Sequence, residues 1–372
     1  MSFLWEGLLA ITWQQVVMYI VGGVLIYLAI CKDFEPALLM PMGFGAILVN
    51  LPFSGVLDQT MQGVGETHGI IQWLFNVGIE TSEALPILLF IGIGAMIDFG
   101  PLLSNPKMFL FGAAAQFGIF FAIAAATLLG FDLKDAASIG IIGAADGPTS
   151  ILVSQVLGSK YVGAIAVAAY SYMALVPIIQ PVVIKAITTK KERLIRMPHV
   201  KAKTISKRTR ILFPILVTLI AGLVAPMSVS LVGFLMFGNL LRECGVLKRL
   251  SETAQNEFAN IITLLLGITI SFSMRAEQFV TLNTLMIIIL GCLPLCSTPW
   301  AACCLPSSST CSSKRKSTMI GACGISAFPM SSRVIHKMGL KEDPQNFLLM
   351  HAAGVNVGGQ IASVIAGGLI LN

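Results

Sequence analysis

The stretch "GAADGPTS", residues 143–150, places a carboxylate inside an apolar run. Its flanks, "SIGII" and "ILVSQVL", are typical of chain buried in a membrane, where an ionised side chain is costly and usually functional. Gly147 and Pro148 follow Asp146 directly and would break a helix, which frees backbone carbonyl oxygens. The stretch therefore predicts a broken membrane helix with a functional aspartate at the break. The alternative is a solvated turn at the membrane surface, but Asp146 lies near the middle of the apolar stretch.

Composition extends this reading to the whole chain. The 372 residues are 56% hydrophobic and 11% charged, with a mean hydropathy of +0.85, whereas soluble domains carry about 25% charged residues. We therefore expect an all-α polytopic membrane protein with about nine to eleven transmembrane segments, some of them broken or re-entrant. The candidate segments are residues 13–30, 37–53, 85–97, 107–130, 137–157, 161–188, 211–226, 229–242, 258–273, 282–296, 318–336 and 345–371.

The longest polar insertion, residues 185–210, holds ten Lys or Arg against one Glu. This charge pattern predicts a cytoplasmic loop under the positive-inside rule, and it is compatible with docking of an acidic soluble partner. We expect no nucleic-acid binding, because the charge sits on one tethered loop of a membrane protein. The start, "MSFLWEGLLAITWQQ", lacks the basic residues and cleavage site of a signal peptide.

The basic loop divides the chain into an N-terminal helix (1–36), a first membrane repeat (37–188), the loop itself (189–210) and a second membrane repeat (211–372). Each repeat contains Gly-rich, apparently interrupted segments with polar residues. Paired broken segments in two halves are typical of inverted repeats with a cation site near the bilayer midplane. The segments are "FIGIGAMIDFGP" (90–101), "GAADGPTSI" (143–151), "IGACGISAFPM" (320–330) and "GVNVGGQIASVIAGG" (354–368).

Asp146 can serve two chemical purposes: its carboxylate could bind a sodium ion, or it could take up a proton as the cation leaves. Tyr170 and Tyr172 lie two residues apart, so on a helix they point to different faces. Membrane tyrosines are often interfacial anchors, but these lie within a segment. One of them could supply a buried hydroxyl, and the residues alone do not choose between these readings.

The second repeat carries its own polar residues. The second polar cluster consists of Asn356, Gly358, Gly359, Gln360 and Ser363, a pattern that suits ligand binding or close helix packing. Ser326 lies beside a Gly- and Pro-containing stretch. Arg333 could snorkel from a helix end or face a cavity. Asp98, in "GAMIDFGP", is a secondary candidate that could simply mark the membrane interface.

Four long motifs together resemble a known family. They are "GAADGPTSI", "AIAVAAYSYMALVPIIQP", "IGACGISAFPMSSRV" and "QNFLLMHAAGVNVGGQIASVIAGG", and "PILLFIGIGAMIDFGPLL" and "TKKERLIRM" match as well. From about residue 36 to the end, the chain resembles the beta subunit of the sodium-translocating biotin-dependent decarboxylases. This family includes oxaloacetate, glutaconyl-CoA and methylmalonyl-CoA decarboxylases.

The resemblance implies an enzyme subunit, a carboxybiotin decarboxylase in the bacterial inner or plasma membrane. It couples decarboxylation and proton consumption to outward sodium transport. The cofactors implied are sodium ion and biotin, the latter as carboxybiotin on a partner subunit. The partners implied are a carboxyltransferase alpha subunit, a biotin carrier protein and a small membrane gamma or delta subunit, and a homo-oligomer is left open. The acid that is decarboxylated is chosen by another subunit.

The resemblance also assigns residues. It places the essential aspartate at Asp146 and the functional tyrosine at Tyr172. Sodium would be bound by Asp146 with ligands from the second repeat, and no other metal is expected. Tyr172 and Arg333 would handle the proton and the carboxylate. The sodium-binding residues are Asp146, Asn356, Ser326 and Gly321, and the secondary candidates are Tyr170, Asp98 and Ser363.

One window departs from the family pattern. The family reads "INP" shortly before the position of Ile320, whereas here Ser317 and Thr318 stand, and upstream "PLCSTPWAACCLPSSSTCSS" replaces an apolar helix. Codons ATC-AAC-CC for Ile-Asn-Pro, read one base on, give TCA-ACC, which encodes Ser-Thr. We hypothesise compensating insertions or deletions near residues 293 and 318, which resequencing of the gene would test.

Another class of protein is compatible with the general features. An ion-coupled secondary transporter of a small organic anion would also contain broken segments and a buried aspartate, and only the family motifs argue against it. A purely structural scaffold does not explain Asp146.

Overall fold

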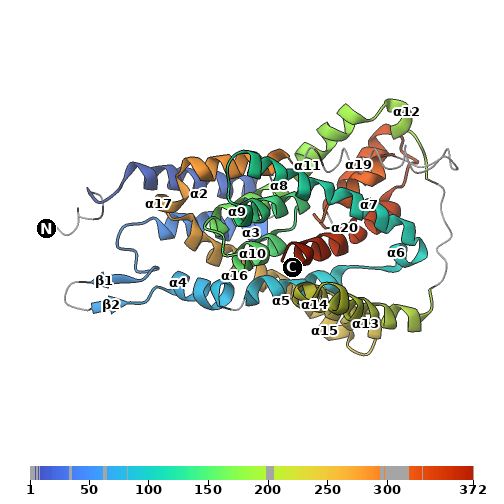
Figure 1. Ribbon diagram of the computed structural model, residues 1–372, viewed down its shortest axis with the longest axis horizontal. Helices are drawn as coiled ribbons and strands as arrows, with labels where there is room; N and C mark the ends of the chain where they lie inside the picture. The colour runs from blue at the N-terminus through green and yellow to red at the C-terminus, as the bar shows by residue number, and fades with distance from the viewer. Residues whose placement is uncertain are drawn as a thin grey trace.

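The computed structural model describes residues 5, 7, 9–32, 36–61, 65–81, 83–197, 205–293, 297, 318–328 and 330–371. The predicted sequence anomaly at 293–318 lies outside these residues, apart from positions 293, 297 and 318. Helices build nearly the whole molecule, which confirms the all-α prediction (Figure 1). The exception is a small antiparallel hairpin of β1 (Gln59–Met61) and β2 (Gly65–Thr67) at the left end in Figure 1.

The helical elements in chain order, with 3-10 and π turns labelled η, are α2 (Trp13–Lys32), α3 (Pro36–Val49), α4 (Ile70–Phe75), η1 (Asn76–Glu80), α5 (Ala84–Met96), α6 (Gly100–Ser104), η2 (Pro106–Met108), α7 (Phe109–Ala115), α8 (Phe117–Leu128), α9 (Leu133–Gly140), η3 (Ile141–Ala144), α10 (Gly147–Val156), α11 (Val162–Ile187), α12 (Lys190–Arg193), α13 (Lys207–Val224), η4 (Pro226–Ser228), α14 (Val229–Cys244), α15 (Lys248–Thr253), η5 (Ala254–Phe258), α16 (Ala259–Ile270), η6 (Ser271–Met274), α17 (Ala276–Phe279), η7 (Thr318–Gly324), α19 (Met330–Glu342) and α20 (Leu349–Ile370). A further apolar helix spans Leu282–Leu293.

Within the described residues, five helices are long and apolar enough to cross a membrane, or up to seven if each of two bent pairs counts as one span. The rest of the expected nine to eleven segments are short or broken. One bent pair is α11, which turns by 66° between Tyr170 and Leu175. Pro177 lies inside α11, and a proline removes the hydrogen bond to the carbonyl four residues earlier, which kinks a helix at this place.

The stretch around Asp146 forms a re-entrant hairpin. The first hairpin (residues 133–156) consists of α9 and η3, a break, and α10. Its two ends meet, because Ser159 Oγ donates to Asp135 Oδ1 at 2.7 Å. From there α11 runs to the basic loop, so we expect both ends of the first hairpin to lie on the membrane side opposite to that loop, which the positive-inside rule predicts to be extracytoplasmic. The break with Asp146 is the tip of this hairpin.

The second hairpin (residues 318–342) consists of η7, a break at 325–328, and α19. Here η7 contacts α12, and Glu342 at the end of α19 pairs with Arg193 at 3.0 Å. Both ends therefore lie on the side of the basic loop, at the right end of Figure 1. The two tips meet, because the Ser326 amide donates to the carbonyl of Ala144 at 2.9 Å. The inverted repeats and their boundaries stay a prediction.

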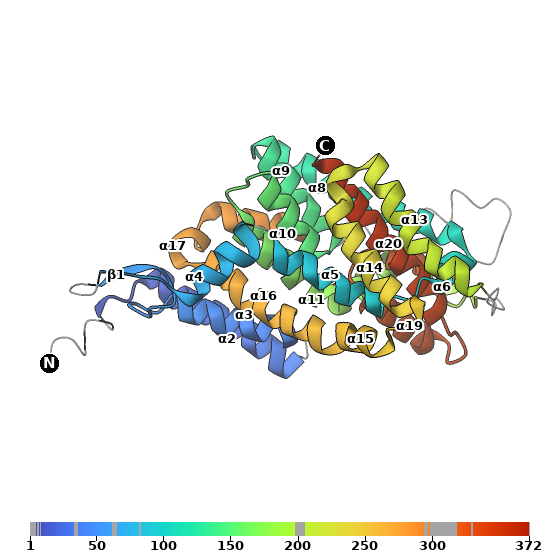
Figure 2. The ribbon, with the colours of Figure 1, turned by 90° about the horizontal axis from the view of Figure 1, so that it is seen from below.

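The predicted interruption at 354–368 is wrong, because α20 is one continuous helix from Leu349 to Ile370. The glycines of α20 allow close packing against neighbouring backbones, and they do not interrupt the helix. A Cβ at Gly359 would overlap the carbonyl of Gly324 in η7, and a Cβ at Gly112 of α7 would overlap the backbone of Gly358. Small residues allow such close approach of backbones in membrane proteins. The continuous α20 therefore lies against several elements, among them α7, α10 and α14, and Figure 2 shows it beside α14.

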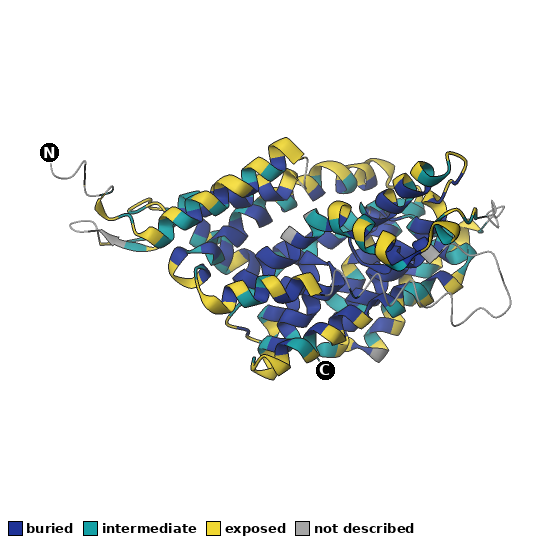
Figure 3. Ribbon diagram, turned by 90° about the horizontal axis from the view of Figure 1, so that it is seen from above, coloured by how far each residue is buried: buried dark blue, intermediate teal, exposed yellow. Residues whose placement is uncertain are grey.

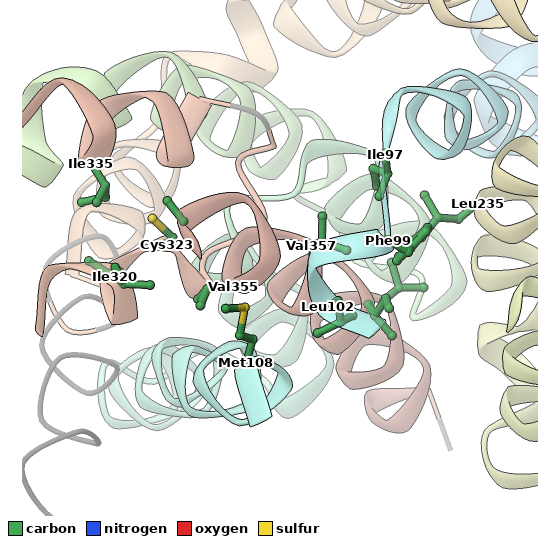
Figure 4. Packing of buried hydrophobic residues seen from close by; sticks show 14 of the residues in the cluster. Ile97, Phe99, Leu102, Met108, Leu235, Ile320, Cys323, Ile335, Val355 and Val357 are labelled. Atoms are coloured by element: carbon green, nitrogen blue, oxygen red, sulfur yellow. The ribbon is translucent and has the colours of Figure 1, made fainter. Parts of the chain in front are cut away.

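The interior is built around α20. Val355 and Val357 pack with Phe99, Leu102 and other residues of the largest apolar cluster (Figure 4). Figure 3 shows buried residues concentrated at the centre of the bundle. The outer faces of α2 and α13 expose large apolar side chains, including those of Ile20 and Leu223. A hydrocarbon environment satisfies this surface, which agrees with a multi-pass membrane protein.

An ion-pair clamp holds the basic loop to the turn between α19 and α20. Arg193 pairs with Glu342, and the Arg196 guanidinium hydrogen-bonds both carboxylate oxygens of Asp343. These hydrogen bonds lower the pKa of Asp343 below its ordinary value. The carboxylate therefore stays ionised throughout the neutral range, and the clamp persists there. The end of the second hairpin at Glu342 is thus fixed to the basic loop.

Labelling with a membrane-impermeant maleimide tests the re-entrant course of the first hairpin. We expect Asp132→Cys and Lys160→Cys to be labelled from the extracytoplasmic side, above the level of the unmodified chain, and Lys190→Cys from the cytoplasmic side only. All three parent residues are exposed. Labelling of positions 132 and 160 from opposite sides would show a continuous broken span in place of a hairpin.

Candidate functional site

The backbone at the tip of the first hairpin presents the Asp146 carboxylate to the start of α10. Ala145 adopts a left-handed conformation (φ 53°), which ends η3. Asp146 is the N-cap of α10, where its side chain accepts a hydrogen bond from the Thr149 amide at 3.4 Å, and Pro148 occupies the first turn. Asp at the N-cap and Pro in the first turn both favour a helix start here. The sequence thus encodes this break locally.

Two side chains of α20 hold the same carboxylate. Gln360 Nε2 donates to Asp146 Oδ2 at 2.9 Å, and Ser363 Oγ donates to it at 3.1 Å. Asp146 is 3% exposed, and the Thr149 hydroxyl lies beside it. Ser363 is a secondary candidate, whereas Gln360 belongs to the same polar cluster of the sequence but has no predicted role there. The signal that could have found Gln360 is its spacing, four residues after Asn356 and three before Ser363, which places all three side chains along one helix face.

Asn356 of α20 holds the tip of the second hairpin. Its Nδ2 donates to the carbonyls of Ile325 at 2.7 Å and Cys323 at 3.2 Å. The residue is fully buried, and its Oδ1 accepts no hydrogen bond from the described residues. Ser326 Oγ donates to the carbonyl of Gly359 at 3.1 Å. A buried amide oxygen without a donor is unusual in proteins, and it is the natural partner of a cation.

The arrangement gathers oxygen atoms where the two hairpin tips meet. A carboxylate, an amide oxygen, hydroxyls and freed carbonyls are ligands for a hard cation, because such ions prefer oxygen. Among the described residues no group of three or more His, Cys, Asp or Glu side chains could hold a metal ion. Gly321 lies buried in η7 and can contribute only backbone. These oxygen atoms are the candidate ligands for a hard cation such as sodium.

Comparison with known proteins gives the family. The Na+-transporting oxaloacetate decarboxylase beta subunit family matches residues 14–372. The chain belongs to this family. It is 46% identical to the glutaconyl-CoA decarboxylase subunit beta of Acidaminococcus fermentans (98% of this chain, 95% of the relative) and 45% identical to the methylmalonyl-CoA decarboxylase subunit beta of Propionigenium modestum (98% and 96%). It is 41% identical to the oxaloacetate decarboxylase beta chain of Klebsiella pneumoniae (98% and 96%).

Membership of the beta-subunit family confirms the resemblance inferred from the motifs, and the match begins upstream of residue 36. It supports the sodium-pumping decarboxylase over the secondary transporter. The protein is thus a membrane component of a multi-subunit decarboxylase.

In this beta-subunit structure the two tyrosines point to different neighbours, as their spacing predicted. The ring of Tyr170 packs over Gly147, where a Cβ would lie 2.7 Å from the ring atom Cδ1. The Tyr172 hydroxyl accepts a hydrogen bond from Cys292 Sγ at 3.4 Å, on the helix Leu282–Leu293. Tyr172 also packs in an apolar cluster that contains Ala145. Both tyrosines therefore border the first hairpin, and Tyr170 lies over the residue next to Asp146.

Two candidates form no hydrogen bond with the Asp146 carboxylate among the described residues. Arg333 is exposed on α19. Asp98 lies in the break between α5 and α6, where its Oδ1 accepts a hydrogen bond from the Gly100 amide at 2.8 Å. Asp98 therefore stabilises the start of α6, which packs against α20.

Proposed function

We propose that this chain couples the decarboxylation of carboxybiotin to outward sodium transport. The observation that carries the proposal is the buried carboxylate of Asp146 at the meeting point of two hairpins from opposite membrane sides. From this position a bound cation could reach the water on either side of the membrane, along one hairpin or the other. A cation bound there can be taken up from one side and released to the other. The family supports sodium as that cation.

The contacts of Asp146 suggest how one cation is held. Oδ2 receives the donors of Gln360 and Ser363, while the hydrogen bond at Oδ1, from Thr149, is the longest of the three. Oδ1 is therefore the carboxylate oxygen offered to sodium. Asn356 Oδ1, Ser326 Oγ and backbone at Gly321 complete the proposed oxygen set. When a proton reaches Asp146, the neutral acid loses its attraction for sodium, and the ion leaves.

The chemical step needs one proton. Carboxybiotin, held by a biotin carrier partner, supplies carbon dioxide when its N–C bond breaks; the electron pair stays on the nitrogen, which takes the proton. We assign proton handling to Tyr172, with Tyr170 as the neighbouring candidate, and the carboxylate to Arg333. The other proposed partners are a carboxyltransferase alpha subunit and a small membrane gamma or delta subunit.

Sodium uptake into inverted membrane vesicles that contain the whole complex tests this function. Oxaloacetate, methylmalonyl-CoA and glutaconyl-CoA are supplied in turn, since the relatives act on these acids. We expect one of them to drive uptake, and avidin, which blocks biotin, to reduce it to background. Uptake that is driven by an ion gradient and is insensitive to avidin would instead favour the secondary transporter.

A further inference from the structure

The exposed face of α19 carries three cationic side chains in a row. Arg333, Lys337 and Lys341 are spaced four residues apart, and all three are exposed. On an α-helix this spacing stacks side chains along one face, with about 6 Å of rise between neighbours. The three residues, here called the α19 track, run along the returning helix of the second hairpin.

The charges of the α19 track are not compensated by the described residues. None of the three cations forms an ion pair there, while the nearby acids are engaged elsewhere: Glu342 with Arg193 and Asp343 with Arg196. Like charges four residues apart on a helix repel each other by about 0.2–0.5 kcal/mol per pair. Within a membrane-embedded hairpin, unpaired cations are costlier still. An anion from outside the chain would compensate these charges.

The two ends of the α19 track lie at functionally distinct places. Lys341 is next to the clamp at the cytoplasmic end, where Figure 1 shows α12 and α19 side by side. Arg333 lies within the first turn of α19, just after the break that carries Ser326 and meets the tip of the first hairpin. The cations thus lead from the cytoplasmic surface toward the Asp146 site.

We propose that Lys337 and Lys341 guide the carboxylate of carboxybiotin along α19 to Arg333. This inference rests on the proposed function and adds two binding residues to it. The lysine ammonium groups are mobile point charges that attract an anion without fixing its orientation, whereas an arginine can hold a carboxylate with two parallel hydrogen bonds. Loose attraction at the entrance and defined binding at the inner end suit a carboxylate carried in by a swinging biotin arm.

The test measures release of labelled carbon dioxide from synthetic N-carboxybiotin by the whole complex. We expect Lys337→Gln and Lys341→Gln each to raise the KM for N-carboxybiotin about fivefold, and the double variant about 25-fold, since each removes one attractive charge. The kcat and the half-saturating sodium concentration stay unchanged. The decline of kcat/KM with added salt becomes shallower in the double variant, because fewer charges remain to be screened. Lys337→Arg keeps the KM of the parent.

Lys248→Gln, an exposed lysine on α15, is the matched control and leaves the KM unchanged. If the parent complex releases carbon dioxide from N-carboxybiotin but the double variant has an unaltered KM, the α19 track is wrong while the proposed function stands. If the double variant changes only the dependence of activity on anionic phospholipid, the cations bind lipid headgroups and the track is likewise wrong. If the parent complex releases no carbon dioxide from N-carboxybiotin, the proposed function itself fails.

Discussion

Asp146→Asn is expected to lower decarboxylation-driven sodium uptake at least about 100-fold, a loss of roughly 2.7 kcal/mol of stabilisation. Asparagine has nearly the shape of aspartate, and its single side-chain oxygen can still accept the hydrogen bonds from Gln360 and Ser363, while its amide nitrogen replaces the oxygen that accepts the long bond from the Thr149 amide. The variant therefore folds but lacks the charge that binds the cation. In a buried site a full charge contributes far more to cation binding than an amide dipole does. Uptake into vesicles and thermal unfolding of the purified complex measure the two properties separately.

Asp132→Asn is the matched control for this experiment. Asp132 is the exposed N-cap of α9 on the same hairpin, so the same chemical change at the base of the hairpin should leave uptake unaltered. Sodium uptake by Asp146→Asn at more than half the parent rate, with an intact complex, would remove Asp146 from the transport site.

Gly359→Ala is expected to lower sodium uptake about 10- to 100-fold and to destabilise the fold by about 1–3 kcal/mol. The added Cβ would overlap the carbonyl oxygen of Gly324 and lie 2.7 Å from its carbon. Both obstacles are backbone, so no side chain can move aside. The tip of the second hairpin must shift away from α20, which pulls Ser326 from the Gly359 carbonyl. Vesicle uptake and the thermal unfolding midpoint measure the two effects.

Gly23→Ala provides the comparison. Gly23 lies in α2 with nothing within 4 Å of the position of its Cβ, so alanine there should be neutral or stabilise the helix by up to about 1 kcal/mol. If Gly359→Ala behaves like Gly23→Ala in both measurements, the close contact between α20 and η7 is not required for the site.

The candidate residues differ in how far their sequence context could place them. Asp146 was predictable because its neighbours specify the break: glycine and proline follow it, and a capping aspartate needs only its own helix. Ser363 and Asn356 were recognisable as polar positions on one helix face, but which hairpin each would hold was not. Gln360 was missed as a ligand of Asp146, since the contact joins residues 214 positions apart in the chain.

Other expectations failed or stayed open for physical reasons. Glycines at 354–368 were read as a broken segment, yet in α20 they make room for neighbouring backbones, and sequence does not distinguish the two uses. Arg333 was expected to handle a carboxylate, and it lies exposed on α19 as part of a cationic row. The role of Tyr172 in proton handling stays a proposal, because the hydrogen bond found for its hydroxyl is the one from the thiol of Cys292.

The sequence by itself determined the membrane class, the family and the break at Asp146, because hydropathy, motifs and local helix signals act over a few residues, while the cytoplasmic location of the basic loop stays a prediction. Only the tertiary structure decided that the break is the tip of a re-entrant hairpin, that a second hairpin meets it from the other side, and that α20 holds both tips. These features depend on hydrogen bonds such as those from Ser159 to Asp135 and from Ser326 to Ala144. Broken spans and re-entrant hairpins have the same local pattern, and only contacts between distant segments tell them apart.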